Sequence, residues 1–519
     1  MAIDPDWPEP SGFADEDLLS LIRRQGEHYG YRRFMSFQDG SSMSFLELRD
    51  RVAGMRARLQ DMGVRPGDRV ALMLKNSLFY PVAWLGIVTG GATAVPINSR
   101  LKGHDAGYIL GHSGSRVVVT DNETHDVVLD AIKRSKTHSE LMKVRTGDPM
   151  PEIVGEDVGA PPPAGELANI QYTSGTTGFP KGCMLTHAYW QWMGAVSRRA
   201  MELDERDTIL TSQPHSYIDP QWQVIAALRG GVHLVLLNGF HPSTFMRSIV
   251  EWRVTVFYCL GVMPALLLRQ PEKLSERDHS LRRVYCSAIP VRLHAEIEER
   301  WGVPWLEAFG MTESGLNTIV GQSEHAGSVG TGCIGRALPH NEAAVLGPAG
   351  DELPAGTPGE LALRGDGFMN GYYKDPEPSA AFFAGGWAHT GDVVEMDEDK
   401  RIYYRGRSKE MIRRAGENIS PAEIETVLGS HPDVIECAVT PVPDAVVEEE
   451  IKAWVVVRPD SSVTAADLHG FLGARLARFK VPRYYEFREE LPHTSSERVV
   501  KHQLGEPLND ATIDIPRAQ

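Results

Sequence analysis

Short apolar runs rich in β-branched residues alternate with helical patterns through most of the first half of the chain. The strand-like runs cover 69–73, 117–120, 232–237 and 254–259, and the helical patterns that follow them cover 80–89, 125–132, 243–252 and 262–268. This alternation is typical of α/β proteins, in which helices connect parallel strands. We therefore expect a large domain of mixed, mostly parallel sheets with packed helices.

After about Arg407, the alternation of strand-like and helical patterns changes to shorter segments. Strand-like segments at 435–440 and 451–457 flank a helix that is expected to begin after Pro421, because proline suits the first turn of a helix. The sequence therefore predicts a large domain over residues 1–408 and a small α+β domain over 409–519. No internal repeat is visible, which argues against a solenoid.

Charge and apolar patterning exclude several classes of protein. The net charge of −16 disfavours binding to nucleic acids and to anionic membrane surfaces. The longest apolar stretch, 254–268, is too short to span a bilayer and contains Gly261 and Pro264. The acidic N-terminus does not fit an export signal, and five widely spaced cysteines fit neither a disulfide framework nor a CxxC metal site. We expect a cytoplasmic protein, and no pattern specifies an oligomeric state.

The segment 172–182, with the sequence YTSGTTGFPKG, is suited to binding phosphate groups. Glycines allow close approach of backbone amides, hydroxyl groups donate further hydrogen bonds, and one lysine adds a positive charge. The candidate phosphate-binding residues are Thr173, Ser174, Gly175, Thr176, Thr177 and Lys181. The segment is not a Walker loop, and it lies between an expected strand at 168–172 and an expected helix at 185–196.

This loop resembles the signature of the adenylate-forming superfamily, which includes acyl-CoA synthetases, peptide-synthetase adenylation domains and luciferases. Four further segments match the family in order: Ser287 to Ile289, Phe309 to Glu313, Trp387 to Asp392, and Gly406 to Lys409. The resemblance extends from about residue 40 to 505. It implies an ATP-dependent enzyme with Mg²⁺ and a small domain that rotates between two half-reactions.

The resemblance also implies roles for individual residues. It places Ser287, Ala288, Phe309 and Gly310 near adenine, Thr312 at the α-phosphate, Asp392 and Arg407 at the ribose, and Lys409 at the hinge. It assigns Mg²⁺ to Glu313 and Thr177, in keeping with the preference of this ion for oxygen ligands. Thr177, Lys181 and Glu313 are thus candidate catalytic residues.

The C-terminal segment departs from the family pattern. Members usually end with Pro-x-Thr-x-x-Gly-Lys, whose lysine reaches the active site during adenylation, whereas this chain has Glu497 at the glycine position and Arg498 at the lysine position. An arginine is a planar fork and does not replace a compact ammonium directly. Lys501 could substitute if the segment is helical, because it would then share a face with Arg498.

The candidate acid pocket follows Pro214 and includes His215, Tyr217, Asp219 and Gln221. This stretch is similar to the crotonobetaine/carnitine-CoA ligase branch of the superfamily. Asp219 and Gln221 could contact a cation, an amine or a hydroxyl group of a substrate, whereas a fatty-acid tunnel would be apolar. Polar residues at the start of a helix explain them equally well.

These features predict an enzyme that uses ATP and Mg²⁺ to form the adenylate of a small acid, polar or aromatic, and then transfers the acyl group to a nucleophilic acceptor such as CoA. An amide-forming ligase and a diazotase-type enzyme that activates nitrite for an aryl amine are the alternatives. A third interpretation is a nucleotide-binding pseudo-enzyme, but the nearly intact ATP motifs argue against it.

Overall fold

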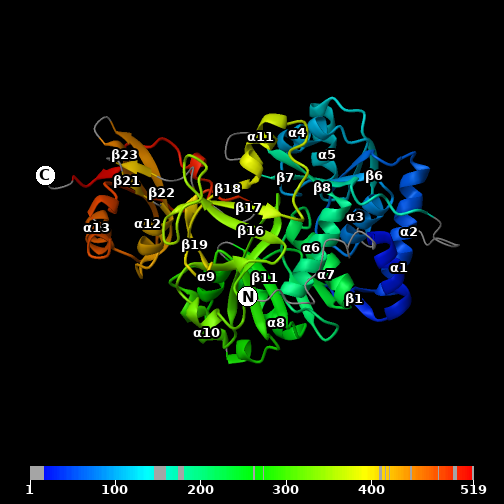
Figure 1. Ribbon diagram of the computed structural model, residues 1–519, viewed down its shortest axis with the longest axis horizontal. Coiled ribbons are helices and arrows are strands. Elements are labelled where there is room, and N and C mark those ends of the chain that lie inside the picture. The colour runs from blue at the N-terminus through cyan, green and yellow to red at the C-terminus, as the bar shows by residue number, and fades with distance from the viewer. Residues whose placement is uncertain are drawn as a thin grey trace.

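The computed structural model describes residues 17–144, 159–173, 180–260, 263–272, 274–407, 412–414, 417–419, 421–444, 447–476, 478–494 and 499–516. A large body, coloured blue to yellow, lies beside a smaller body, coloured orange to red (Figure 1). Two sheets and their helices form the larger body, and the smaller body contains a sheet of its own. The predicted class, α/β with a large sheet domain and a smaller C-terminal domain, is confirmed.

Within the described residues, one six-stranded sheet has the order β6-β5-β3-β4-β7-β8. Its strands are β3 (Arg69–Met73), β4 (Thr93–Pro96), β5 (Val117–Thr120), β6 (Glu140–Lys143), β7 (Leu167–Thr173) and β8 (Lys181–Thr186). Helices α3 (Phe79–Thr89), α4 (Gly103–Ser113) and α5 (His125–Ser135) connect successive strands. The strands run parallel except for the antiparallel pair β7 and β8.

A second sheet has 13 strands in the described part of the chain. Its parallel half contains β1 (Arg33–Phe37), β10 (His233–Leu236), β9 (Thr208–Thr211), β11 (Val256–Leu260), β12 (Arg283–Ser287) and β13 (Trp305–Met311), and β2 (Ser42–Ser44) is antiparallel at its edge. The sheet then continues antiparallel through β14 (Gly315–Ile319), β15 (Cys333–Ala337), β19 (Ile402–Arg407), β18 (Ala388–Met396), β17 (Gly359–Gly365) and β16 (Asn341–Leu346).

Further helices cover the larger body. They are α1 (Leu18–Tyr29), α2 (Phe45–Asp61), α6 (His187–Ala200), α7 (Ile218–Gly230), α8 (Pro242–Glu251), α9 (Met263–Leu268), α10 (His294–Trp301) and α11 (Pro376–Phe382), with short 3₁₀ turns η2 (Leu274–Arg277), η3 (His325–Gly327) and η4 (Ala384–Gly386). Every residue from Pro220 to Leu228 in α7 is buried. A helix that is buried on all sides must lie inside the protein. One hydrophobic core joins α6 and α7 to strands of both sheets.

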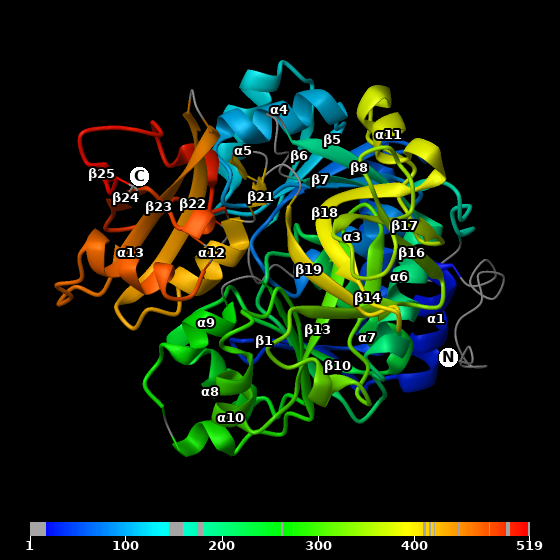
Figure 2. The same cartoon turned by 60° about the vertical axis from the view of Figure 1, so that its left-hand side comes forward.

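The smaller body has its own sheet and core. Its strands are β20 (Ile412–Arg414), β21 (Glu417–Ile419), β22 (Val434–Asp444), β23 (Glu448–Val457), β24 (Tyr484–Phe487) and β25 (Ile513–Asp514), and its helices are α12 (Pro421–Leu428), α13 (Ala465–Gly473), η6 (Arg478–Lys480) and η7 (Lys501–Gln503). Apolar residues from α12, α13, β22 and β23 form a separate cluster. Helix α12 contacts β19 of the larger body (Figure 2).

Two details differ from the sequence-based expectations. The helix expected at 185–196 begins only at His187, because residues 181–186 form strand β8 and pair antiparallel with β7. The glycine-rich loop therefore connects two paired strands rather than a strand and a helix. The large sheet is parallel only in one half, because the strands after β13 return through hairpins.

Other expectations concern cysteines, membrane spans and the domain boundary. All five cysteines are free thiols, as expected. No helix within the described ranges combines the length and apolar character that crossing a bilayer requires. The sheet changes between β19, which ends at Arg407, and β20, which begins at Ile412. Lys409 lies between them and outside the described residues, so its role as a hinge stays a prediction.

Candidate active site

A cavity of about 410 Å³ brings together several of the sequence motifs. Thr173 at the end of β7, and Thr312 and Glu313 between β13 and β14, line it. Arg407 at the end of β19 and Thr494 of the smaller body line it as well. The cavity therefore has walls from both sheets of the larger body and from the C-terminal segment.

On the phosphate-loop side of the cavity, Lys181 is connected to Glu313 through Tyr372. Strand register pairs Thr173 with Lys181, and the Lys181 ammonium lies 5.0 Å from the centroid of the Tyr372 ring. The hydroxyl of Tyr372 donates a 2.9 Å hydrogen bond to Oε1 of Glu313. Burial raises the pKa of Tyr372 well above its usual value, so the hydroxyl keeps its proton at neutral pH. Ser174, Gly175, Thr176 and Thr177 lie outside the described residues.

Hydrogen bonds to two backbone carbonyl groups hold the segment that carries Thr312 and Glu313. The Tyr189 hydroxyl donates to the carbonyl of Thr312 at 3.1 Å, and the amide of Met369 donates to the carbonyl of Glu313 at 2.8 Å. These bonds come from α6 and from the segment after β17. Two elements distant in sequence therefore fix the orientation of this turn.

Gly310 permits a close approach between β13 and β14. A Cβ atom at this position would lie 2.4 Å from the carbonyl oxygen of Gly315, which is far inside the contact distance of the two atoms. The preceding Phe309 is half-buried and packs against the main core. The strand register shifts between Phe309 and Gly310, as expected for a bulge that redirects the following side chains.

A buried carboxylate organises the segment predicted to lie beside adenine. Ala288 has a positive φ of 73°, which is uncommon for a residue with a Cβ atom. The amides of Ala288 and Ile289 donate to the carboxylate of Glu307 at 2.5 Å and 2.9 Å. Burial raises the pKa of Glu307 to about 8, while the two amide donors act in the opposite direction. Ser287 lines the cavity, and its hydroxyl lies 2.8 Å from the hydroxyl of Tyr258.

The two predicted ribose residues contact each other. Asp392 on β18 pairs in register with Arg407 on β19, and Arg407 Nε lies 2.9 Å from Asp392 Oδ1. The Asp392 side chain is 2% exposed and that of Arg407 is 36% exposed. Only Arg407 of the two lines the cavity. The Asp392 carboxylate thus holds the guanidinium at the cavity wall, and contact with a ribose stays a prediction for both.

The predicted acid-pocket residues divide into two groups. Tyr217 and Asp219, at the start of α7, line the cavity. His215 and Gln221 are fully buried and are not among its lining residues. The side chain of Gln221 donates to the carbonyl of His215 at 2.9 Å, and the His215 ring contacts Asn76. Burial lowers the pKa of His215 to about 3, so its ring is neutral. These two residues stabilise the start of α7 from the core side, away from the cavity.

The aromatic side chains beside Asp219 shape one end of the cavity. Trp222 donates from its indole nitrogen to Asp219 Oδ1 at 3.2 Å. The ring of Tyr258 lies edge-on to Trp222 with centroids 5.4 Å apart, and both residues line the cavity. This wall combines one carboxylate with three aromatic rings, since Tyr217 belongs to it as well.

The C-terminal cation candidates are placed differently from each other. Arg498 lies outside the described residues, whereas Lys501 Nζ lies 2.9 Å from Glu425 Oε1 on α12. Val499 forms a β-bridge with His493 and the 3₁₀ turn begins only at Lys501, so residues 499–501 are not one helix. Because Arg498 lies outside the described residues, the choice between Arg498 and Lys501 as the catalytic cation stays a prediction.

Comparison with known proteins explains why these motifs meet. The AMP-binding enzyme family model matches residues 22–373, and the AMP-binding enzyme C-terminal domain model matches residues 423–498. The chain belongs to the AMP-binding enzyme family. Curated relatives of this AMP-binding enzyme include feruloyl-CoA synthase from Amycolatopsis sp, 32% identical over 470 residues, which cover 90% of this chain and 94% of the relative.

A crotonobetaine/carnitine–CoA ligase from Salmonella paratyphi A is 30% identical over 516 residues, covering 94% of this chain and 99% of the relative. Among solved structures, ATP-bound MatB from Rhodopseudomonas palustris superimposes with a TM-score of 0.84 at 26% identity, covering 94% of this chain and 98% of MatB. MenE, the o-succinylbenzoate-CoA synthetase from Bacillus subtilis, superimposes in its complex with the OSB-AMP intermediate with a TM-score of 0.82, at 26% identity and with the same coverage. These matches confirm the sequence-based assignment to the adenylate-forming enzymes.

Two functional contacts were not visible in the sequence. Tyr372 and Glu313 are separated by 59 positions, and no local pattern around Tyr372 indicates that its hydroxyl reaches the metal-binding candidate. Glu307 reaches Ala288 and Ile289 across 19 and 18 positions. Glu307 precedes the Phe309 motif by two residues, which is the one sequence signal that could have drawn attention to it.

Proposed function

We propose that this AMP-binding enzyme activates a small carboxylic acid with ATP, releases pyrophosphate, and transfers the acyl group to CoA. The observation that carries the proposal is the single cavity shared by Thr173, Thr312, Glu313, Arg407 and Thr494, with an aromatic and acidic wall at the start of α7. This arrangement would supply phosphate-binding and acid-binding surfaces within one cavity. The names of the curated relatives, which are CoA synthases and ligases, support CoA as the acceptor.

The side chains around Glu313 fit a magnesium nucleotide. A carboxylate on the cavity wall suits a hard cation, which prefers oxygen ligands. Glu313, together with Thr177 from the sequence motif, would hold Mg²⁺, whose charge would offset that of the phosphates. Tyr372 keeps the Glu313 carboxylate in place through its hydrogen bond, and Lys181 adds a nearby positive charge.

In the first half-reaction, a carboxylate oxygen of the acid attacks the α-phosphorus of ATP. The bond from that phosphorus to the bridging oxygen breaks, and pyrophosphate leaves with the electron pair. In the second, the sulfur of CoA attacks the acyl carbon, its proton is lost, and AMP leaves. The protein would contribute mainly by positioning the reactants and stabilising charge at the α-phosphate, a role for which Thr312 on the cavity wall is the candidate.

The acid is proposed to be aromatic or planar and to carry a hydrogen-bond donor at its far end. Tyr217, Trp222 and Tyr258 provide flat apolar surfaces, and Asp219 provides an acceptor between them. A long aliphatic acid would displace water from the Asp219 carboxylate and offer it no hydrogen-bond donor, which is unfavourable. The cavity volume of about 410 Å³ lies at the lower end of the range for small-molecule sites.

The function is tested by measuring pyrophosphate release from ATP with a panel of acids. We expect release only when an acid is present, and formation of an acyl-CoA when CoA is added. Release that needs nitrite and an aminophenyl acid would support the diazotase-type alternative instead. Binding of ATP with no release under any of these conditions would support a pseudo-enzyme.

The acid class is tested with a matched pair, 4-hydroxycinnamate and cinnamate, which differ by one hydroxyl group. A hydrogen bond to a charged group contributes about 1.5–3 kcal/mol, so the hydroxylated acid should have roughly a tenfold or greater advantage in kcat/KM. Asp219→Asn should reduce that advantage. Equal discrimination in the variant and the wild type would show that Asp219 does not contact the far end of the acid.

A further inference from the structure

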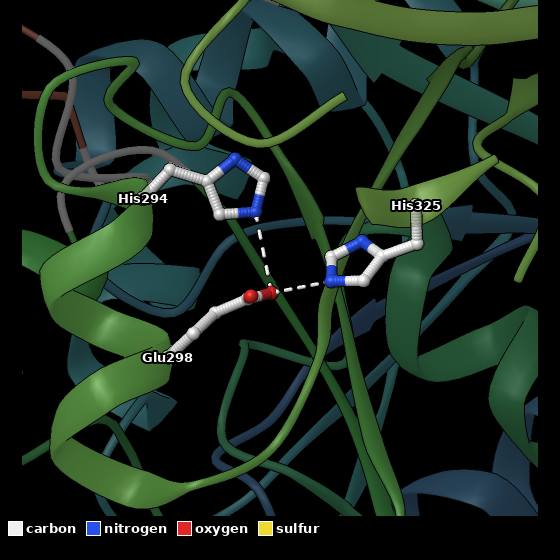
Figure 3. A group of neighbouring side chains, drawn as sticks. All are labelled: His294, Glu298 and His325. Atoms are coloured by element: carbon white, nitrogen blue, oxygen red, sulfur yellow. Dashed lines mark ion pairs between the residues drawn. The ribbon is translucent and has the colours of Figure 1, made fainter. Parts of the chain in front are cut away.

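Three side chains of metal-ligating type meet at a place outside the cavity. His294 and Glu298 lie one helical turn apart on α10, and His325 is the first residue of η3 (Figure 3). Glu298 Oε1 lies 2.8 Å from His325 Nε2 and 3.5 Å from His294 Nε2. Among the described residues that line the cavity, none belongs to this group. We refer to the three residues as the His–Glu–His cluster.

We propose that the His–Glu–His cluster binds a divalent transition-metal ion of the Zn²⁺ class. Two imidazoles and one carboxylate form a recognised donor set for zinc, and the remaining position is open to water. In tetrahedral geometry, metal–ligand distances of about 2.1 Å imply separations between ligand atoms of roughly 3.4 Å. Two of the three separations in the cluster are 2.8 Å and 3.5 Å, and all three ligand atoms lie within 4.8 Å of one another.

Backbone groups orient two of the three side chains. The amide of Trp305 donates to Glu298 Oε1 at 2.6 Å, and the amide of Gly330 lies 3.4 Å from His294 Nδ1. The carbonyl oxygen of Trp305 lies 2.8 Å from His294 Nε2. An ion bound by Nε2 would therefore compete with this carbonyl contact.

Exposure of the three side chains permits an ion to enter. The side chain of His294 is 6% exposed, that of His325 is 15% exposed and that of Glu298 is 21% exposed. A fully enclosed site would lack an entry path, and a fully exposed one would lack fixed geometry.

The ion would tie three parts of the fold together. Helix α10 provides two ligands and η3 provides the third, while the backbone of Trp305 begins β13. Four residues further along β13, Phe309 opens the motif that leads to Glu313. Metal binding at the His–Glu–His cluster would therefore stabilise the strand that leads to the nucleotide motif, without contact with the reactants.

The first experiment titrates the full-length, metal-free protein with Co²⁺, which substitutes for Zn²⁺ and gives a visible absorption spectrum. We expect saturation at one Co²⁺ per chain, displacement of Co²⁺ by Zn²⁺, and a higher Tm with Zn²⁺ present. Absence of a saturable site with one equivalent of Co²⁺ in the wild type would overturn the proposal, whatever the behaviour of variants.

The second experiment compares His325→Gln with His104→Gln. His325 holds η3 but makes no contact with the backbone of Trp305 among the hydrogen bonds described above, so its variant is expected to fold with a Tm close to the wild type without metal. His104 is exposed and its ring contacts its neighbour Asp105, so it controls for weak binding by other histidines. Loss of the site in His325→Gln alone supports the proposal. Equal Co²⁺ binding by both variants and the wild type overturns it.

Discussion

Replacing Tyr372 by Phe tests whether Glu313 depends on a hydroxyl that is remote in sequence. The change removes the 2.9 Å hydrogen bond to Glu313 and keeps the ring that lies 5.0 Å from the Lys181 ammonium. A hydrogen bond to a charged acceptor contributes about 1.5–3 kcal/mol. At 1.4 kcal/mol per factor of ten, kcat/KM for magnesium ATP should fall by roughly 10- to 150-fold.

The assay is pyrophosphate release at several Mg²⁺ concentrations, with thermal unfolding measured in parallel. We expect a weaker response to Mg²⁺ in the variant, because the Glu313 carboxylate loses the group that orients it. Tyr373→Phe is the matched control, since it removes the same atom from the neighbouring residue, whose ring packs against His112. A Tyr372→Phe enzyme with wild-type kcat/KM and Mg²⁺ dependence would refute the reasoning.

Three further predictions concern the close approach of β13 to β14 and the small domain. Gly310→Ala should reduce both stability and adenylation, because its Cβ atom would lie 2.4 Å from the Gly315 carbonyl oxygen; unchanged Tm and rate would contradict this. Alanine at Arg498 and at Lys501 should have unequal effects on pyrophosphate exchange, with a loss of about 10²–10³ for the catalytic cation. Given the contact of Lys501 with Glu425, we expect the larger loss at Arg498. Lys409→Pro should slow adenylation and acyl transfer unequally, as measured in separate half-reaction assays, and equal slowing would argue against a hinge.

Local patterns in the sequence were sufficient for much of the site. Thr173, Thr312, Glu313 and Arg407 each belong to a short motif at the end of a strand, and the structure places all four on the lining of one cavity. Strand ends in α/β folds converge on the same region, so motifs that are far apart in sequence meet there. The alternation of strand-like and helical patterns along the chain predicted the strands and helices themselves.

Contacts between distant segments could not be predicted in this way. His215 and Gln221 are polar and lie next to pocket residues in sequence, yet their hydrogen bonds are directed into the core. The helix expected from residue 185 begins later, because pairing of β8 with β7 outweighs the local helical pattern. Tyr372 is the converse case, a contact that the sequence did not reveal. No local pattern around Tyr372 indicates a hydrogen bond to Glu313.

Thr494 places part of the smaller body on the cavity wall. A ligand that fills the cavity therefore contacts both bodies at once, and its affinity includes the free energy of bringing them together. If only a fraction of molecules has this arrangement, the apparent Kd rises by the inverse of that fraction. By reciprocity, the ligand shifts the equilibrium between the two bodies toward the arrangement in which Thr494 lines the cavity. Substitutions on the face of the smaller body that meets β19 should therefore change ligand affinity without touching the ligand.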